Sequence, residues 1–244
     1  MQRKILIKLV GIPFYAFIYN TSLANVLINL FHNDHFFIEE LNTLLLLYIP
    51  ILFFASVGKD GRLFENRTKV SNKKNLFLGI IFFICLSVCH TFIQIAYGLT
   101  QFEMSDFVRH LPSFTNVLLS LPSSIIIAPI IEEIVFRKLL YSDVKNSFPK
   151  FYILILTISF MLAHFIQIVD SPITAPFYFL ISLALNLFYR KDENLFYTII
   201  FHSMTNLTVT FTIYYAIFLQ STIHMPLIFG SIIILILLLI ILLK

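Results

Sequence analysis

The stretch IEEIVFR, residues 131–137, places two adjacent carboxylates and a guanidinium inside an otherwise apolar run, residues 117–141. A run of this length is long enough to cross a membrane as a helix. A charged side chain at bilayer depth costs about 2.5–3.5 kcal/mol on insertion scales, so such a residue is expected to have a partner or a chemical role. The stretch therefore indicates both a membrane protein and the position of a site within it.

Helical spacing separates the two glutamates. Glu133 lies four residues before Arg137, which is the favourable order for an ion pair along a helix. Glu132 is turned about 100° away from that face. We interpret Arg137 as neutralising Glu133 and leaving Glu132 available as a general base. The alternative is a purely structural pair that holds two helices together.

The composition of the chain predicts its class. Of its 244 residues 59% are hydrophobic and 12% are charged, and the mean hydropathy is +0.90. Soluble domains carry about 25% charged residues. The sequence therefore predicts an all-α, polytopic membrane protein with one domain over residues 1–244. Cys85 and Cys89, four residues apart in an apolar run, predict buried small side chains and no disulfide framework.

Eight apolar segments are expected to be transmembrane helices: 9–31, 41–57, 76–99, 117–141, 151–169, 173–189, 195–219 and 226–243. The first is interrupted by polar residues and has no clean cleavage site, so we expect it to be retained and not removed as a signal peptide. With a cytoplasmic N-terminus, every one of the 17 lysines and arginines except Arg109 lies on the cytoplasmic side. The positive-inside rule then places both termini in the cytoplasm. This charge distribution indicates contact with membrane lipid and excludes a nucleic-acid partner.

Two further predicted spans carry polar side chains at depth. Phe160 and His164 lie one turn apart on one face of the fifth, and His202 and Asn206 lie one turn apart on one face of the seventh. At about 1.5 Å per residue, Glu132, His164 and His202 lie about 12–20 Å from the cytoplasmic ends of their spans. A single intramembrane histidine is commonly an interhelical hydrogen-bonding residue. Three ionisable groups at a similar depth, together with an amide, instead predict a polar site within the membrane.

Three motifs on three separate spans carry a resemblance to a known family: Glu132-Glu133-x-x-x-Arg137, Phe160-x-x-x-His164 and His202-x-x-x-Asn206. In this order they resemble the CPBP family of CAAX-protease and bacteriocin-processing intramembrane endopeptidases, also called Abi proteins. The resemblance covers residues 128–206, about a third of the chain. It implies a bundle of eight transmembrane helices with a polar cavity that opens toward the cytoplasmic side.

The resemblance also implies roles for the motif residues. Glu132 would activate the attacking water with help from His164, and His202 and Asn206 would stabilise the oxyanion of the tetrahedral intermediate. Each oxyanion donor is worth about 2.7–4 kcal/mol in such reactions. Structural support is expected from Glu133, Arg137 and Phe160.

A metal-dependent alternative uses the same residues. Glu132, His164 and His202 could form a three-ligand zinc site with an open fourth position. If Glu132 were a ligand while Glu133 is paired with Arg137, no carboxylate would remain as the base. The sequence also lacks the His-Glu-x-x-His motif of zinc proteases. We therefore expect a glutamic-type mechanism without a cofactor, and keep the zinc-dependent version as the alternative.

The predicted function is cleavage of a small peptide precursor or of a membrane-proximal segment of a protein substrate. Richness in Phe, Ile, Asn and Lys is typical of AT-rich bacterial genomes, so we expect a bacterial plasma-membrane protein acting on unprenylated substrates. One rival function is a non-catalytic scaffold or immunity protein. Another is a proton-coupled transporter, against which the absence of internal repeats weighs. The residues carry no signal for an oligomeric state.

Overall fold

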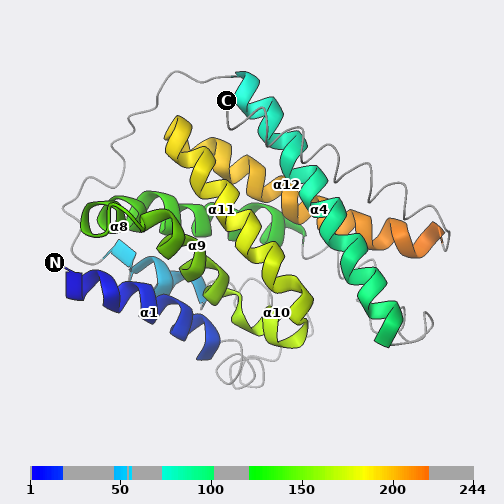
Figure 1. The fold of residues 1–244 in the computed structure, drawn as a ribbon, viewed down its shortest axis with the longest axis horizontal. Helices are drawn as coiled ribbons and strands as arrows, with labels where there is room; N and C mark the ends of the chain where they lie inside the picture. The colour runs from blue at the N-terminus through cyan, green and yellow to red at the C-terminus, as the bar shows by residue number, and fades with distance from the viewer. Residues whose placement is uncertain (1, 19–46, 54, 57–72, 102–120, 220–244) are drawn as a thin grey trace.

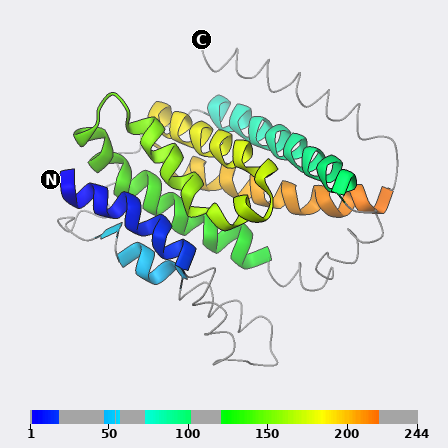
Figure 2. The same ribbon diagram turned by 60° about the horizontal axis from the view of Figure 1, so that its bottom comes forward.

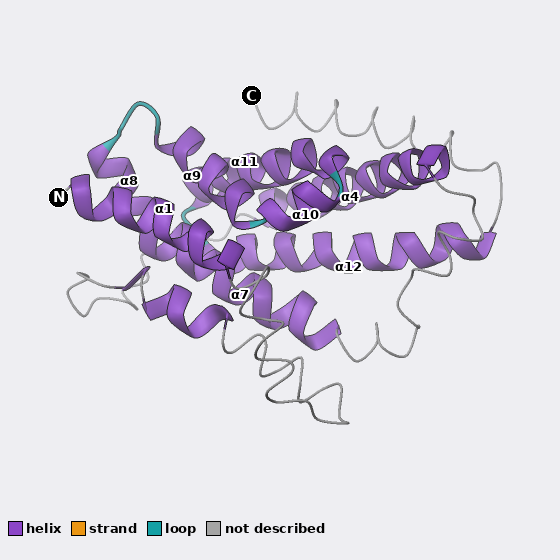
Figure 3. Cartoon of the chain, turned by 90° about the horizontal axis from the view of Figure 1, so that it is seen from below, coloured by secondary structure: helices purple, strands orange, loops and turns teal. Residues whose placement is uncertain are grey.

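The computed structural model describes residues 2–18, 47–53, 55–56, 73–101 and 121–219. All regular elements in these ranges are helices (Figures 1 and 3). The all-α prediction is therefore confirmed for the part of the chain that the structure describes. The predicted span 226–243, and large parts of the first two predicted spans, lie outside these residues.

The helices follow one another along the chain as α1 (Gln2–Ile18), α4 (Lys73–Gln101), η2 (Pro122–Ile127), α7 (Ala128–Glu133), η3 (Ile134–Leu140), α8 (Tyr141–Ser147), α9 (Tyr152–Ala163), α10 (Phe165–Asp170), η4 (Pro172–Thr174), α11 (Ala175–Asp192) and α12 (Leu195–Leu219). The last of these has the predicted bounds, 195–219. Two stretches among the described residues are long and apolar enough to cross a membrane, Lys73–Gln94 and Pro172–Asp192. The predicted count of eight spans is not confirmed.

The described part of the fourth predicted span is one continuous helix that changes its winding three times. It runs through η2, α7, η3 and α8, and so continues beyond the predicted end at residue 141. η2 and η3 are π-helical, and the Ala128 N–H donates to the carbonyl of Ser123, five residues back. Pro129 has no N–H to donate, so the regular pattern of backbone hydrogen bonds is already incomplete there. A wider, π-helical turn at this point therefore costs few further hydrogen bonds. Both glutamates of the motif thus lie in a short α-helical piece between two π-helical ones.

The fifth predicted span, 151–169, is interrupted, which corrects the prediction of one continuous helix. α9 ends at Ala163 and α10 begins at Phe165, and His164 between them has φ −102° and ψ 24°. The His164 N–H donates to the carbonyl of Met161, three residues back, over 3.0 Å. The carbonyl of Phe160, which a regular α-helix would pair with this N–H, is therefore available to a side chain.

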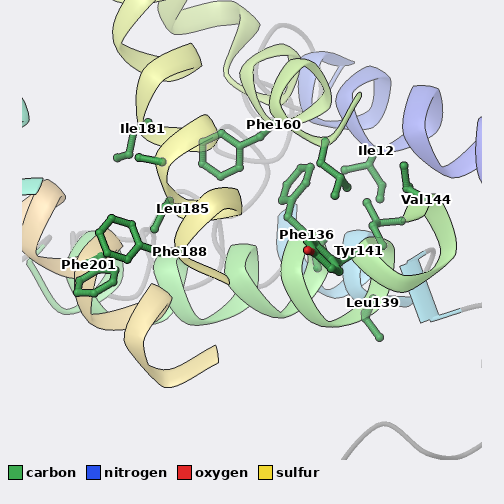
Figure 4. Close-up of a cluster of buried hydrophobic side chains, with 14 of the residues drawn as sticks. Ile12, Phe136, Leu139, Tyr141, Val144, Phe160, Ile181, Leu185, Phe188 and Phe201 are labelled. Carbon is green, nitrogen blue, oxygen red and sulfur yellow. The ribbon is translucent and has the colours of Figure 1, made fainter. Parts of the chain in front are cut away.

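The helices pack around one contiguous apolar core that extends from α1 to α12. α4 lies along α12, while α9 lies against both α11 and α1 (Figures 1 and 2). Aromatic rings fill the contact between α11 and α12, where the centroids of Phe188 and Phe201 are 4.9 Å apart (Figure 4). The ring of Phe83 stacks on Phe201 at 5.1 Å. This packing fixes α12, and with it His202, relative to α4 and α11.

Gly79 of α4 is buried directly against the ring of Phe201, and a Cβ atom at this position would overlap the ring atoms. Because Phe201 is fully buried and stacked on Phe83, it has little room to move. We expect Gly79→Ala to lower the free energy of unfolding by about 1–3 kcal/mol. Denaturant unfolding in detergent measures this loss. If overlap is the cause, Phe201→Leu will cost less in the Gly79→Ala background than in the wild-type chain, and equal costs would contradict it.

Candidate active site

Glu133 and Arg137 form a fully buried ion pair. Arg137 Nη1 lies 3.0 Å from Glu133 Oε1, and neither side chain is exposed. The pair expected from the four-residue spacing is thus present. Arg137 Nη2 also donates to the carbonyl of Ser182 on α11 over 3.4 Å, and the guanidinium lies 5.0 Å from the centroid of the Phe160 ring. Groups on three elements, α7, α9 and α11, therefore hold the arginine in place.

His202 lies between the two glutamates. Its Nδ1 is 2.9 Å from Glu133 Oε1, the same oxygen that accepts from Arg137. Because this carboxylate oxygen is the acceptor of the arginine, His202 Nδ1 is the donor in the second contact. The other ring nitrogen, Nε2, faces Glu132 Oε2 at 3.8 Å. Glu133 therefore determines which edge of the imidazole faces Glu132.

His164 is oriented in an equivalent way by the helix break. Its Nδ1 lies 3.0 Å from the carbonyl oxygen of Phe160. A carbonyl only accepts, so Nδ1 carries the hydrogen, and Nε2 faces Glu132 Oε2 at 3.7 Å. The ring of Tyr178 on α11 stacks on the imidazole with centroids 4.5 Å apart. The break between α9 and α10 thus supplies the acceptor that fixes this ring.

The two oxygens of Glu132 have different surroundings. Oε1 accepts a hydrogen bond of 2.6 Å from the hydroxyl of Tyr48. Oε2 is buried, has no hydrogen-bond partner among the residues that the structure describes, and faces the two imidazole nitrogens at 3.7 and 3.8 Å. These separations exceed a direct hydrogen bond and match a position bridged by water. With both Nδ1 atoms acting as donors, the Nε2 atom of a neutral imidazole is an acceptor, so a water held there can donate one hydrogen to Glu132 Oε2 and the other to His164 Nε2.

A cavity of about 90 Å³ adjoins Glu132 and His164. Its polar wall also includes Tyr48 and Gln167, and its apolar wall comes from α1 and residues 47–53. A space of this size holds several water molecules, and a polar lining gives them partners. A cavity thus lies beside the glutamate, while its predicted polar character and the side of the membrane to which it opens remain predictions.

Asn206 lies one turn beyond His202 on α12. Its Nδ2 donates to the carbonyl of Ser124 on η2 over 2.8 Å. The contacts of the described residues therefore join Asn206 to η2, and not to the cluster of Glu132, His164 and His202. An amide nitrogen carries two hydrogens, so the bond to Ser124 orients the group and leaves a second N–H for a ligand.

Three partners in this arrangement were not predicted from the sequence. They are the hydroxyl of Tyr48, the ring of Tyr178 and the carbonyl of Ser124. A tyrosine inside an apolar segment is unusual enough to notice, but it gives no indication of its partner. The carbonyl of Ser124 belongs to the backbone and has no sequence signal.

The fit of zinc to these side chains can be judged from their arrangement. Two imidazoles with partners on Nδ1 and one carboxylate have the right chemistry for zinc. Among the described residues, however, no group of three His, Cys, Asp or Glu side chains is arranged so that it could hold a metal ion. The absence of a metal therefore stays a prediction, and the steps below use none.

A family model described as type II CAAX prenyl endopeptidase Rce1-like matches residues 114–208. The matched segment includes all three motifs, so the predicted resemblance to CAAX-type intramembrane proteases is confirmed over this segment. No curated protein and no solved structure matches the chain. The match begins at residue 114. The segments before it, α1, residues 47–53 and α4, therefore lie outside the match.

Proposed function

We propose, on the premise that residues 114–208 are Rce1-like, that the chain is an intramembrane endopeptidase with a glutamate-activated water. Its substrate is a small peptide precursor or the membrane-proximal segment of a membrane protein. One observation carries the proposal: a buried carboxylate oxygen of Glu132 faces Nε2 of both His164 and His202 at 3.7 and 3.8 Å. This geometry suits a water that is held and deprotonated at one point.

In the first step Glu132 Oε2 accepts a proton from this water while His164 Nε2 holds it. The oxygen of the water forms a bond to the carbonyl carbon of the scissile peptide, and the carbonyl π bond becomes an oxyanion. The Asn206 amide, and His202 when Nε2 is protonated, donate hydrogen bonds to that oxyanion. The C–N bond then breaks, and Glu132 returns its proton to the leaving nitrogen.

Glu133 and Arg137 support this chemistry without touching the substrate. Glu133 Oε1 accepts from His202 Nδ1 and fixes the tautomer and the orientation of the ring. Arg137 neutralises the carboxylate that does so, which makes the charge tolerable in a fully buried position. The arrangement corresponds to a triad in which an acid orients a histidine that acts on the reacting atoms.

Removal of the Asn206 amide tests the oxyanion assignment. We expect Asn206→Ala to lower kcat about 100-fold with little change in KM, because the lost donor acts on the transition state. Asn186→Ala is the matched control, since this buried amide on α11 contacts Thr157. The control should lose stability and keep its kcat. An equal loss of kcat in both variants would contradict the role of Asn206.

The activity itself is tested with the purified chain in detergent and two probes. One is a farnesylated peptide ending in a CAAX sequence, and the other is a library of unprenylated peptides. We expect mass spectrometry to find cleaved unprenylated peptides; cleavage of the farnesylated peptide alone would keep the protease and overturn the substrate. Folded protein that cleaves neither probe, together with full cellular function of Glu132→Ala, would favour the scaffold. Solute uptake by proteoliposomes would favour the transporter.

The metal-free mechanism has its own test. We propose that activity is unchanged by a membrane-permeant chelator and that the purified protein holds less than stoichiometric zinc. Stoichiometric zinc, with activity lost on its removal and restored by its return, would replace this mechanism by the zinc-dependent one.

We propose a location in a bacterial plasma membrane, crossed several times, with both termini in the cytoplasm. A membrane location fits the Rce1-like match and the two apolar helices that are long enough to cross. The basic residues support the orientation, because all but Arg109 lie in segments assigned to the cytoplasmic side. Reporter fusions at each terminus would report cytoplasmic positions, and an external terminus would reverse the assignment.

A further inference from the structure

We infer that Tyr48 is a positioning residue for the general base, supplied by a part of the chain outside the Rce1-like match. The inference rests on the proposed function, in which Glu132 is the base. Tyr48 lies in the helical segment 47–53, and its hydroxyl donates to Glu132 Oε1 over 2.6 Å. The two residues are 84 positions apart, so the contact depends on the tertiary fold.

The length and burial of this hydrogen bond indicate a substantial interaction. A distance of 2.6 Å lies in the range of hydrogen bonds from a hydroxyl to an ionised carboxylate, which are about twice as strong as neutral ones. The side chain of Tyr48 is 7% exposed, so water does not readily replace the phenol. The phenol therefore holds the carboxylate by one oxygen, and the ionised carboxylate is the form that accepts a proton from water.

The hydrogen bond from Tyr48 also gives the two carboxylate oxygens of Glu132 different roles. Tyr48 occupies Oε1, whereas Oε2 makes no hydrogen bond to the described part of the chain and faces the imidazoles. Without the phenol, the carboxylate can rotate and present either oxygen to the water. Tyr48 and Glu132 line the same cavity, so the tyrosine lies on the side from which a substrate would approach.

Several other groups face Glu132 and would also influence its ionisation. They are His164 at the α9–α10 break, His202 on α12, Tyr178 on α11 and Arg137 on η3. Within the described part of the chain none of them donates a hydrogen bond to either carboxylate oxygen, whereas Tyr48 does. The phenol is therefore the group whose removal changes the hydrogen bonding of Glu132 without removing a charge.

The test compares Tyr48→Phe with Tyr141→Phe, which removes a buried phenol that packs on Tyr152 and Tyr189 away from Glu132. We expect Tyr48→Phe to lower kcat about tenfold with KM unchanged, because a hydrogen bond to a charged group is lost. Tyr141→Phe should match the wild type in both.

A second readout does not depend on activity. Dicyclohexylcarbodiimide modifies protonated carboxyl groups in apolar surroundings, and peptide sequencing by mass spectrometry distinguishes labelling of Glu132 from labelling of Glu133. We expect several-fold faster labelling of Glu132 at neutral pH in Tyr48→Phe than in the wild type or Tyr141→Phe. Tyr48→Leu, which also lacks the hydroxyl, replaces Tyr48→Phe if the latter does not fold.

The outcomes separate the two proposals. Faster labelling of Glu132 in the absence of any peptidase activity would support the role of Tyr48 and count against the proposed function. Wild-type rates of Glu132 labelling in Tyr48→Phe would overturn the role of Tyr48, whatever the peptidase activity of the chain.

Discussion

Glu132→Gln is expected to lower peptide cleavage by roughly 10⁴-fold in kcat, because an amide cannot accept the proton of the attacking water at neutral pH. The substitution is close in shape and removes no donor on which the fold depends. The remaining side-chain oxygen can still accept from Tyr48, which now donates to Glu132 Oε1 over 2.6 Å. The expected result is therefore an inactive protein with a wild-type unfolding transition, measured with the peptide probes and by denaturation in detergent.

Glu133→Gln is the matched control, because it makes the same chemical change at the next residue. Glu133 contacts Arg137 and His202 and has no exposed surface. Its substitution should lower stability, because Arg137 is left buried without a full counter-charge. Its effect on kcat should be smaller than that of Glu132→Gln, since it acts through the orientation of His202. A stable, inactive Glu133→Gln beside an active Glu132→Gln would reverse the assignment of the two glutamates.

The features predicted from the sequence were those with a local physical cause. Spacing along one helix predicted the ion pair of Glu133 with Arg137, which the structure contains at 3.0 Å. Hydropathy predicted residues 195–219 as one helix, and α12 has these bounds. Similar depths predicted that Glu132, His164 and His202 would meet, and Nε2 of each histidine lies 3.7–3.8 Å from Glu132 Oε2.

The features that the sequence did not predict depend on contacts between distant segments or on backbone groups. Tyr48 contacts Glu132 across 84 residues, and no spacing rule connects the two. The break at His164 lies in an apolar run without proline or glycine, so hydropathy predicted a continuous helix there. Pro129 has no N–H for the helical hydrogen-bond ladder, but a single proline does not predict the π-helical turns that lie on both sides of α7. The acceptor that orients each histidine, Glu133 Oε1 for His202 and the carbonyl of Phe160 for His164, is therefore visible only in three dimensions.

Arg137→Met is expected to lower the free energy of unfolding by about 3–5 kcal/mol, because it leaves the Glu133 carboxylate buried without its counter-charge. Both side chains of this pair have no exposed surface. Asp143→Asn is the control, since Asp143 lies 3.7 Å from Lys8 and its side chain is 29% exposed. A partly exposed pair contributes at most about 1 kcal/mol. Denaturant unfolding in detergent measures both changes, and similar losses in the two variants would contradict the special role of the buried pair.

The double variant Glu133→Leu with Arg137→Met separates stability from function. Replacement of a buried ion pair by apolar side chains of similar volume is often neutral for stability, so the double variant should be more stable than Arg137→Met alone. His202 Nδ1 would nevertheless lose the acceptor that it now contacts at 2.9 Å. Its ring would no longer be held with Nε2 toward Glu132, and kcat should fall by about 10²-fold, as for other losses of orienting partners. A stable double variant with wild-type activity would mean that the pair only joins helices, because the one function proposed for it beyond packing is to orient His202.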